Sequence, residues 1–474
     1  MVSLRISLPP SLARAASAYQ SGRLAEAERA CTETLAAEGD SFAALRLLAV
    51  VQLDLGKTEA ALSSFDRALG LRPDDAGILY DRGRALRRLQ RQEEALASYD
   101  RTLELRPDWV EAHNNRGNAL TDLGRLDEAL ASYDRALGIR SDDAETLFNR
   151  GNTLWSLRRT EEALDSYDRA LAAQPDLADA VYNRANLLKE LGRLEESLAG
   201  YDRSLEIQPG DAPSHFNRGH TLIELGRLDE ALASYETALV ANPEHALAFS
   251  GVANCVIKLC QLEKWHALAE ELSRNVTDRK SVVTPFVLLR YSGEPELQWQ
   301  CARAYAAYKV PSLPEPMWTG ERWRHDKLRV AYLSADFREH AMSYLIAGML
   351  ERHDRSRFEI TGVSFGPDDG GATRRRLAAA FDQFLDVRAD SDAGIARHLR
   401  DLEVDIAVDL MGYTRHSRPA ILSHRPAPIQ VSYLGYPGTM GVEWIDYVIA
   451  DAVVAPFSQQ PFFTESIVQL PDCY

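Results

Sequence analysis

The feature that most constrains this chain is a repeat of 34 residues that fills its first half. A glycine recurs at this spacing, and an aromatic residue keeps the same step further along each unit. The glycine slots hold Gly22, Gly56, Gln90, Gly124, Arg158, Gly192 and Gly226, and the aromatic slots hold Phe65, Tyr99, Tyr133, Tyr167, Tyr201 and Tyr235. Such a period excludes one globular core for this half, because each unit can bury its apolar face only against its neighbours.

Two helical patterns fall in each unit, which is typical of tetratricopeptide repeats. The predicted units are residues 8–41, 42–75, 76–109, 110–143, 144–177, 178–211 and 212–245, and an irregular helical pair follows at 246–258 and 262–273. In the fourth unit, Gly117 is expected to let the second helix approach the first, and Gly124 to free the turn for a positive φ. The stacked pairs predict an α-solenoid with a concave binding surface over residues 8–275.

Asparagine recurs on the first helix of successive units, although it is a poor helix former. Asn115, Asn149, Asn183 and Asn217 all occupy the sixth place of their units. We interpret these amides as a ladder that binds the backbone of an extended protein substrate in the concave groove. At about 1 kcal/mol per hydrogen bond, this ladder would bind many sequences loosely. The alternative is structural: each amide forms a hydrogen bond with the neighbouring repeat or lies on a solvent-exposed face of its helix.

Composition and charge narrow the classes of partner. The chain of 474 residues carries a net charge of −16, which argues against nucleic acid or an anionic membrane as a partner. Its first residues lack the pattern of a secretory signal, and no apolar run is long enough to span a membrane. The five cysteines are scattered without a CxxC pair, which fits a cytoplasmic protein and gives no metal framework. The repeats also offer a surface through which two copies of the chain can associate as a homo-oligomer.

After a linker at residues 276–326, with predicted helices at 282–289 and 297–308, strands alternate with helices. Predicted strands lie at 330–333, 358–365, 383–387, 406–411, 428–434 and 447–450, and predicted helices at 341–352, 373–381, 393–402 and 419–423. This alternation predicts a mostly parallel, Rossmann-like α/β domain over residues 327–474. The first strand is not followed by GxGxxG, so a dinucleotide cofactor is disfavoured, and no HExxH, GxSxG or Walker A sequence occurs either.

Unusual residues follow three of the predicted strands. They form the segments Asp336 to His340, Gly412-Tyr413-Thr414, and Leu434-Gly435-Tyr436-Pro437-Gly438-Thr439. Ligands of open α/β sheets bind at the carboxyl ends of the strands, so convergence of these segments would form a ligand cleft. His340 can act as an acid or base near neutral pH, but a histidine after a strand can equally pack or cap a helix. The glycines of 434–439 can likewise serve only to shape a turn.

Four segments of the second half resemble one specific family. LRVAYLSADFREH, DLMGYT, RPAPIQVSYLGYPGTMG and DYVIAD are similar to the amino-terminal catalytic half of the O-linked N-acetylglucosamine transferases. The SPINDLY-type O-fucosyltransferases of plants share this architecture, including the tetratricopeptide repeats. The resemblance implies a GT-B fold of two Rossmann-like halves that transfers a sugar from a nucleotide donor to Ser or Thr with inversion. It favours UDP-N-acetylglucosamine as the donor and implies neither a metal nor another cofactor.

The same resemblance suggests roles for individual residues. His340 matches a histidine proposed as the base in the family, and Asp336 matches the aspartate of that loop. The sequence leaves open whether one of these groups, water or the phosphate takes the proton. Leu434 and Gly435 match residues beside the donor sugar, and the remaining residues of the two glycine-containing segments complete the expected donor site. In animal members a His-rich segment lies near the sugar, whereas residues 283–288 here hold no histidine.

Relatives continue into a second Rossmann half that supplies a lysine and main-chain donors to the diphosphate, whereas this sequence stops at Tyr474. Because stabilisation of the leaving group is among the largest catalytic effects, the sequence predicts a fragment with little transfer activity of its own. Two other interpretations remain open. One is a tetratricopeptide scaffold with an inert sheet, and the other is a relative that uses GDP-fucose or modifies asparagine.

Overall fold

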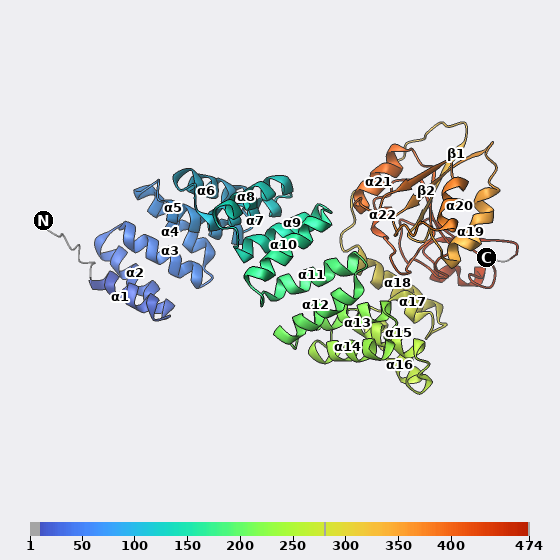
Figure 1. Cartoon of the computed structure of the whole chain (residues 1–474), viewed down its shortest axis with the longest axis horizontal. Coiled ribbons are helices and arrows are strands. Elements are labelled where there is room, and N and C mark those ends of the chain that lie inside the picture. The colour runs from blue at the N-terminus through green and yellow to red at the C-terminus, as the bar shows by residue number, and fades with distance from the viewer. Residues whose placement is uncertain (1–9, 279–280, 473–474) are drawn as a thin grey trace. The chain divides into compact units, whose positions relative to one another are not determined.

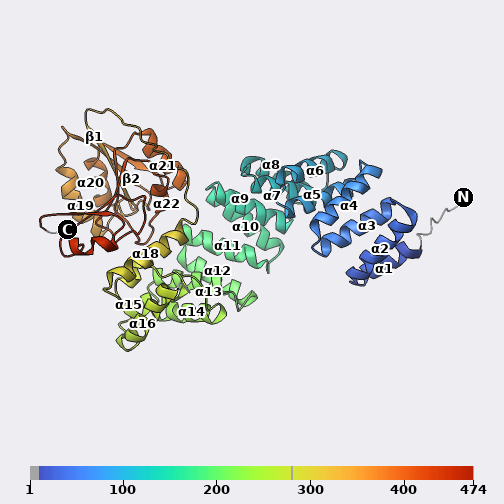
Figure 2. The same cartoon turned by 180° about the vertical axis from the view of Figure 1, so that it is seen from behind.

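The computed structural model describes residues 10–278 and 281–472 (Figure 1). The predicted domains also include residues 8, 9, 279, 280, 473 and 474, which lie outside the described residues. The chain divides into two compact units, Met1–Pro209 and Gly210–Tyr474. Figure 2, which turns the molecule by 180°, shows that the first unit holds helices and that the second holds helices and a sheet.

Unit 1 is built from helix pairs, one pair for each predicted repeat. The helices are α1 (Pro10–Gln20), α2 (Leu24–Glu38), α3 (Phe42–Asp54), α4 (Thr58–Leu71), α5 (Ala76–Arg88), α6 (Gln92–Leu105), α7 (Val110–Asp122), α8 (Leu126–Ile139), α9 (Ala144–Ser156), α10 (Thr160–Ala173), α11 (Ala178–Glu190) and α12 (Leu194–Ile207). The two helices of each pair pack on each other, and each pair packs on the next. The prediction of an α-solenoid is therefore confirmed.

A glycine on the first helix of a unit makes room for the tyrosine ring of the second helix. A Cβ atom added to Gly117 would lie 2.4 Å from Cε1 of Tyr133, which is closer than real Cβ contacts allow. The tyrosine is 1% exposed, so this approach completes the core of the unit. Close approach at Gly117 is confirmed. The same relation joins Gly83 with Tyr99, Gly151 with Tyr167, and Gly219 with Tyr235.

The turn between the two helices of a unit requires a left-handed backbone. Gly124 has a φ of 74°, as predicted, and four further glycines of this slot lie between 73° and 75°. Gln90 and Arg158, which replace glycine in two units, each adopt a φ of 60°. A residue with a side chain in this left-handed conformation costs about 1 kcal/mol. The turns at Gln90 and Arg158 therefore keep the geometry of the other turns at the expense of stability in these two units.

Unit 2 begins with the last predicted repeat and the irregular helical pair. The repeat consists of α13 (Ala212–Glu224) and α14 (Leu228–Ala241), and the pair of α15 (Ala248–Lys258) and α16 (Leu262–Asp278). Two linker helices follow, α17 (Pro285–Leu288) and α18 (Pro295–Lys309). Both begin at a proline, which lacks the N–H group that the first turn of a helix leaves unpaired. The predicted helix at 282–289 is correspondingly shorter in the structure.

A parallel sheet in the order β3-β2-β1-β4-β5-β6-β7 forms the rest of unit 2. Its strands are β1 (Leu328–Ser334), β2 (Phe358–Ser364), β3 (Gln383–Asp386), β4 (Ile406–Asp409), β5 (Ile429–Tyr433), β6 (Tyr447–Ala450) and β7 (Ser466–Gln469), and its helices are α19 (Ala341–Glu351), α20 (Ala372–Ala380), α21 (Asp392–Asp401), α22 (Ala420–Ser423) and the short η1 (Phe457–Phe462). The predicted Rossmann-like domain is confirmed. The prediction that 447–450 closes the set of strands is wrong, because β7 adds an edge strand beyond it.

Helices cover both faces of this sheet. Alternate residues of β1 point to opposite sides: Val330 and Tyr332 pack against α19 and α20, whereas Ala331 and Leu333 pack against α21 and α22. Ala302 and Ala306 of α18 belong to the second of these cores. The segment predicted as a helical linker therefore contributes a helix to the core of the sheet domain.

Candidate active site

The loop after β1 holds the two residues predicted to take part in catalysis. Asp336 is 8% exposed, and Nδ1 of His340 lies 3.6 Å from its Oδ2. The second carboxylate oxygen lies 3.3 Å from Nη2 of Arg338. His340 is the N-cap of α19, where its Nδ1 accepts the N–H of Met342 at 3.3 Å. The capping role considered for His340 is thus present, and its side chain remains 43% exposed.

The position of the imidazole proton decides what His340 can do. While Nδ1 accepts the Met342 N–H, the proton of the neutral ring must be on Nε2, and Nε2 cannot act as a base. With the proton on Nδ1, the ring would instead face the carboxylate of Asp336 as a donor, and the Nε2 lone pair would be free to accept a proton. The charge of Asp336 would favour this second tautomer, which base catalysis requires, whereas the bond from Met342 favours the first.

The loop after β4 is held by a buried carboxylate. Asp409 accepts the backbone N–H of Met411 at 2.9 Å and that of Gly412 at 3.0 Å. Burial raises the pKa of Asp409 to about 6, although these two hydrogen bonds act in the opposite direction. Gly412 adopts a φ of 55°, and Thr414 donates through its hydroxyl to the carbonyl of Met411 at 2.9 Å. These bonds fix the backbone of residues 411–414.

The loop after β5 passes close to the main chain of the β4 loop. A Cβ atom on Gly435 would lie 2.0 Å from the carbonyl oxygen of Leu410, so only glycine fits there. Leu434, the preceding residue, has a φ of 69°. Tyr436 packs on the other side, where a Cβ atom on Gly412 would approach it to 2.4 Å. The glycines of this segment shape the turn, and they also bring two loops into contact.

The three strand-end segments lie side by side at one edge of the sheet. They follow β1, β4 and β5, which are consecutive in the sheet order. The hydroxyl of Ser334 and the N–H of Ala335 both approach Sδ of Met411, at 3.3 and 3.4 Å. The structure therefore brings together the segments of His340, Gly412 and Leu434, as a ligand cleft at the carboxyl ends of parallel strands requires.

Several side chains expected at the donor point into the protein. The hydroxyl of Tyr413 donates to the carbonyl of Met440 at 2.6 Å, and that of Thr439 to Oε2 of Glu465 at 2.7 Å. Tyr436 is 3% exposed and packs on Tyr413, with ring centroids 5.6 Å apart. These three residues hold the loops in shape, and a ligand can meet only their backbone. The residues of these segments with exposed or partly exposed positions are Thr414, Leu434, Gly435 and Pro437, whereas Gly412 and Gly438 are buried.

Two residues directly after the β4 segment were not recognised from the sequence. Arg415 contacts Glu224 of α13, with Nη2 and Oε1 2.5 Å apart, and thus joins the last repeat to the strand-end loops. Burial alone would raise the pKa of Glu224, but the hydrogen bond of His220 and the charge of Arg415 lower it to about 2. His416 follows with a φ of 64°, and burial, together with the charge of Arg415, lowers the pKa of its imidazole. The signal in the sequence was an Arg-His pair next to a glycine turn at a strand end.

The asparagines of the predicted ladder make hydrogen bonds within the array. Nδ2 of Asn115 donates to the hydroxyl of Tyr80 at 2.8 Å, and Nδ2 of Asn149 to Oδ1 of Asn114 at 3.0 Å. Nδ2 of Asn183 donates to Asn152 of the preceding repeat at 2.9 Å. These bonds match the structural alternative. An amide has two N–H groups and an acceptor oxygen, so one bond does not use its full capacity and a role in binding peptides stays a prediction, also for Asn217.

The described residues show neither a metal-binding cluster nor a membrane-spanning helix. Within residues 10–278 and 281–472, no group of three or more His, Cys, Asp or Glu side chains is arranged to hold a metal ion. Over the same residues, no helix has the length and apolar character needed to cross a membrane.

Comparison with known families assigns a class to each half. Residues 314–474 match the model of glycosyl transferase family 41. Residues 12–76, 80–144, 148–212 and 212–245 match models of the tetratricopeptide repeat. The helical array thus matches tetratricopeptide repeats, and the sheet domain matches glycosyl transferase family 41.

Individual relatives agree with this class. The chain is 33% identical over 202 residues to the probable UDP-N-acetylglucosamine–peptide N-acetylglucosaminyltransferase SEC of Arabidopsis thaliana, covering 40% of this chain and 21% of that protein. It is 35% identical over 149 residues to the enzyme of that description from Caenorhabditis elegans, covering 31% and 13%. A solved mutant of the Thermobaculum terrenum O-GlcNAc transferase aligns over 70% of this chain and 58% of its own, at 25% identity and a TM-score of 0.48. The chain spans about a fifth or less of the curated relatives it matches.

Proposed function

We propose that this chain acts in a protein O-glycosyltransferase that transfers N-acetylglucosamine from UDP-N-acetylglucosamine to Ser or Thr hydroxyls with inversion. The observation that carries the proposal is the convergence of the β1, β4 and β5 loops within the segment that matches glycosyl transferase family 41. The names of the relatives from Arabidopsis and Caenorhabditis support the donor and the peptide acceptor.

In this proposal His340 and Asp336 act on the acceptor hydroxyl. Displacement at the anomeric carbon requires removal of the hydroxyl proton and departure of the nucleoside diphosphate. Nε2 of His340 would accept the proton, while Asp336, 3.6 Å from Nδ1, would stabilise the resulting imidazolium. A correctly placed base of this kind contributes about 10²–10⁴ in rate.

The donor in this proposal is bound by the backbone of the two glycine-containing loops. The partly exposed main chain of Gly435 would meet the sugar, while the contacts of Gly435 with Leu410 and of Gly412 with Tyr436 hold the two loops in place. Leu434 and Pro437 would supply apolar contact, and Thr414 a hydroxyl. No metal or further cofactor is part of the proposal.

A transfer assay with the protein purified from cells that express its gene tests this proposal. The protein is incubated with acceptor proteins and, in parallel, with UDP-N-acetylglucosamine and GDP-fucose. We expect label to be transferred from the first donor and released from the product by β-elimination, as for a Ser or Thr linkage. Transfer only from GDP-fucose, or a linkage stable to β-elimination, would contradict the proposed donor or acceptor.

Two variants with a matched control test the proposed base. His340→Ala and Asp336→Asn should each lower kcat by about 10²–10⁴ without changing the helical content. His398→Ala is the control, because His398 of α21 lies 3.2 Å from Asp390 of the loop after β3 and so forms a similar pair outside the β1, β4 and β5 loops. Unchanged turnover of His340→Ala would remove His340 from the mechanism.

A non-catalytic scaffold is the second candidate function. It is favoured by the capping bond of His340 and by the amides of Asn115 and Asn149, which are bonded within the array. A scaffold would bind protein partners yet neither transfer nor hydrolyse any nucleotide sugar in the same assay.

A further inference from the structure

Tyr99 of the array lacks the hydrogen bond that the tyrosines of the three following units make. The hydroxyls of Tyr133, Tyr167 and Tyr201 donate to Asn118, Asn152 and Asn186 at 2.8, 2.6 and 2.6 Å. Tyr99 occupies the same place in the unit 76–109 and is fully buried, but its hydroxyl has no hydrogen-bond partner among the described residues. The residue in the place of the asparagine is Arg84, whose guanidinium has no acceptor atom.

The same unit differs from its neighbours at two further positions of its first helix. Arg87 stands where the next units have Thr121, Trp155 and Lys189, and Arg88 stands where they have Asp122, Ser156 and Glu190. The change at Arg88 reverses or adds a charge relative to all three following units. Helix α5 therefore carries three arginines at places where α7 carries Asn, Thr and Asp.

These arginines and Tyr99 line a single pocket of about 610 Å³, together with Gln90, Gln92, Asn115 and Asp122. Part of its positive charge is already paired. Nε of Arg87 lies 2.9 Å from Oδ2 of Asp122, and Nη1 of Arg84 lies 3.1 Å from Asp81. Arg88 donates one N–H to the carbonyl of Leu53 at 3.0 Å. Each guanidinium has five N–H groups, so the pocket keeps donors beyond these bonds.

We propose that this pocket binds an Asp or Glu side chain of an acidic segment in the protein acceptor, an inference that rests on the proposed function of the repeats as an acceptor-binding surface. A carboxylate has two oxygens that accept hydrogen bonds, and the guanidinium groups of Arg84, Arg87 and Arg88 offer charged donors to them. Asn115, the first member of the asparagine ladder, lines the same pocket. An acidic side chain here would fix one point of a polypeptide that lies along the ladder.

Charge selects a carboxylate rather than a phosphate as the occupant. Arg84 is paired with Asp81 and Arg87 with Asp122, so one net positive charge remains at the pocket, which a single carboxylate balances and a phosphate dianion exceeds. The whole chain has a net charge of −16, so its general field repels acidic proteins. A local cluster of arginines is therefore required wherever the array is to retain an acidic segment.

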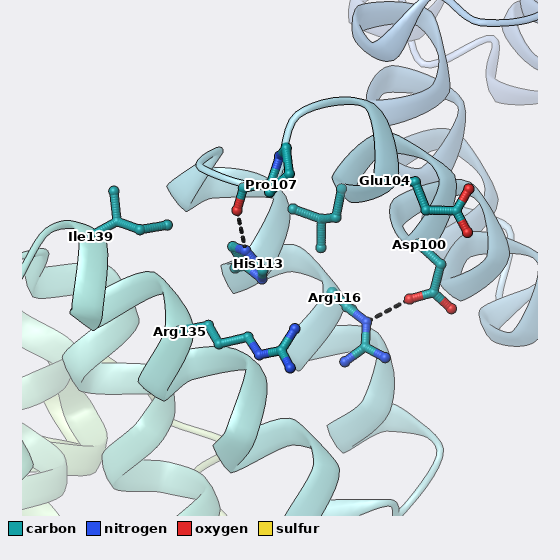
Figure 3. Close-up of a pocket in the computed structure, with 8 residues that line it drawn as sticks. Asp100, Glu104, Pro107, His113, Arg116, Arg135 and Ile139 are labelled. Atoms are coloured by element: carbon teal, nitrogen blue, oxygen red, sulfur yellow. Dashed lines mark hydrogen bonds and ion pairs between the residues drawn. The ribbon is translucent and has the colours of Figure 1, made fainter.

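A second pocket of unit 1 serves as the internal control. It has a volume of about 560 Å³ and is lined by residues of α6, α7 and α8 (Figure 3). Its charges are balanced, because Asp100 and Glu104 face Arg116 and Arg135, and Nε of Arg116 bonds to Asp100 at 2.6 Å. Arg135 is thus an arginine of the same array in a pocket without excess positive charge.

Fluorescence anisotropy with labelled peptides tests the proposal on the full chain and needs no transfer activity. The probes are a short peptide in which Glu alternates with Ser, its Gln counterpart, and a counterpart with phosphoserine and Gln. We expect the Glu peptide to bind about tenfold more tightly than the Gln peptide, and this preference to shrink as salt is added. Arg84→Asn, which installs the residue of the three following units, should abolish the preference, whereas Arg135→Asn should retain it.

The variant Arg84→Asn also guards against a folding artefact. The new amide oxygen gives the Tyr99 hydroxyl the acceptor that Asn118 gives to Tyr133, so we expect thermal stability to hold or rise while the preference for Glu is lost. Equal binding of the Glu and Gln peptides, or an unchanged preference in Arg84→Asn, would overturn the proposal. Tighter binding of the phosphoserine peptide would overturn the choice of a carboxylate. Because binding is measured without a donor, none of these results depends on whether the transferase proposal holds.

Discussion

Glycine solves different problems in the array and in the sheet domain. In the array, a Cβ atom on Gly117 would strike a ring atom of Tyr133, which is a side chain. In the sheet domain, a Cβ atom on Gly435 would strike the carbonyl oxygen of Leu410, and one on Gly366 would lie 1.8 Å from that of Ala335. Side chains can be exchanged by substitution, whereas the backbone is present whatever the sequence.

One repeat shows how the array uses this freedom. Ala185 stands in the place of Gly117, and the partner helix carries Gly200 where the other units have serine, or alanine in the first unit. A Cβ atom on Gly200 would lie 2.8 Å from that of Ala185, so the space given up on one helix is returned on the other. The array can therefore change its residues in pairs, but the loops of the sheet domain cannot. Substitutions in the two regions test whether the array tolerates changes that the loops of the sheet domain do not.

Gly435→Ala should be the most damaging of these changes. The added methyl group overlaps main-chain atoms, so the β5 loop must move away from the β4 loop, at a cost of about 3 kcal/mol in the free energy of unfolding. Denaturant unfolding of the chain measures this loss, and hydrogen exchange should locate it in residues 410–440. Gly293→Ala is the control, because nothing lies within 4 Å of its Cβ position. Equal stability of the two variants would show that the loop is not fixed by this contact.

A pH dependence should appear in the sheet domain because of Asp409. Burial raises its pKa from 3.8 to about 6, so between these values the folded state binds a proton that the unfolded state has released. Stability should therefore be highest at low pH in this window and fall by about 3 kcal/mol as the pH rises through it, then level off.

Hydrogen exchange at several pH values checks this prediction. Peptides from β4 and its loop should lose protection between about pH 4 and 6 as Asp409 ionises. Asp409→Asn should flatten that dependence. Peptides from α7 and α8 should change little, because the Arg125–Glu128 pair and its equivalents are exposed surface pairs. A response in the array equal to that of β4 would contradict this assignment.

Gly117→Ala should destabilise the array by about 1–3 kcal/mol through overlap with Tyr133. The natural pair Ala185 and Gly200 provides the matched rescue, which is the double variant Gly117→Ala with Ser132→Gly. We expect the double variant to recover part of the loss in melting temperature, and a double-mutant cycle gives the coupling between the two sites. Strictly additive effects would show that the two helices do not compensate each other.

Arg158→Gly should give the smallest effect and the opposite sign. Arg158 has a φ of 60° in the slot where glycine adopts about 74°, so glycine removes backbone strain at this place. We expect a gain of at most about 1 kcal/mol, reduced by the greater freedom of glycine in the unfolded chain. Gly124→Ala should cost a similar amount at the equivalent turn. Thermal melts of both variants measure the pair of shifts.

The architecture followed from the sequence because it depends on periodic patterns. The period of 34 residues and the alternation of strands and helices each average over many positions. A single exception such as Gln90 therefore does not change the predicted architecture. Strand β7 escaped prediction because Ile467 is its one buried residue, as befits the edge of the sheet. Strand β6 is equally short, but two of its four residues are buried and its apolar character could be recognised.

The site was only partly predictable because side-chain direction depends on distant packing. Tyr413 and Tyr436 stand in turns and looked available to a ligand, but Tyr305 and Phe286 from the preceding helices pack against them, at centroid distances of 5.1 and 6.4 Å. The amide of Asn149 is likewise directed by how successive repeats stack. In each case the deciding contact comes from residues far away along the chain.

The pairing of Glu224 with Arg415 has a practical consequence for anyone who divides this molecule. A cut after residue 275, where the repeats end by sequence, would strip the sheet domain of α13 and leave the Arg415 guanidinium with no carboxylate from that helix. A cut ahead of Gly210 keeps both partners on one piece and coincides with the border between the compact units. The last repeat is best handled as a structural accessory of the sheet.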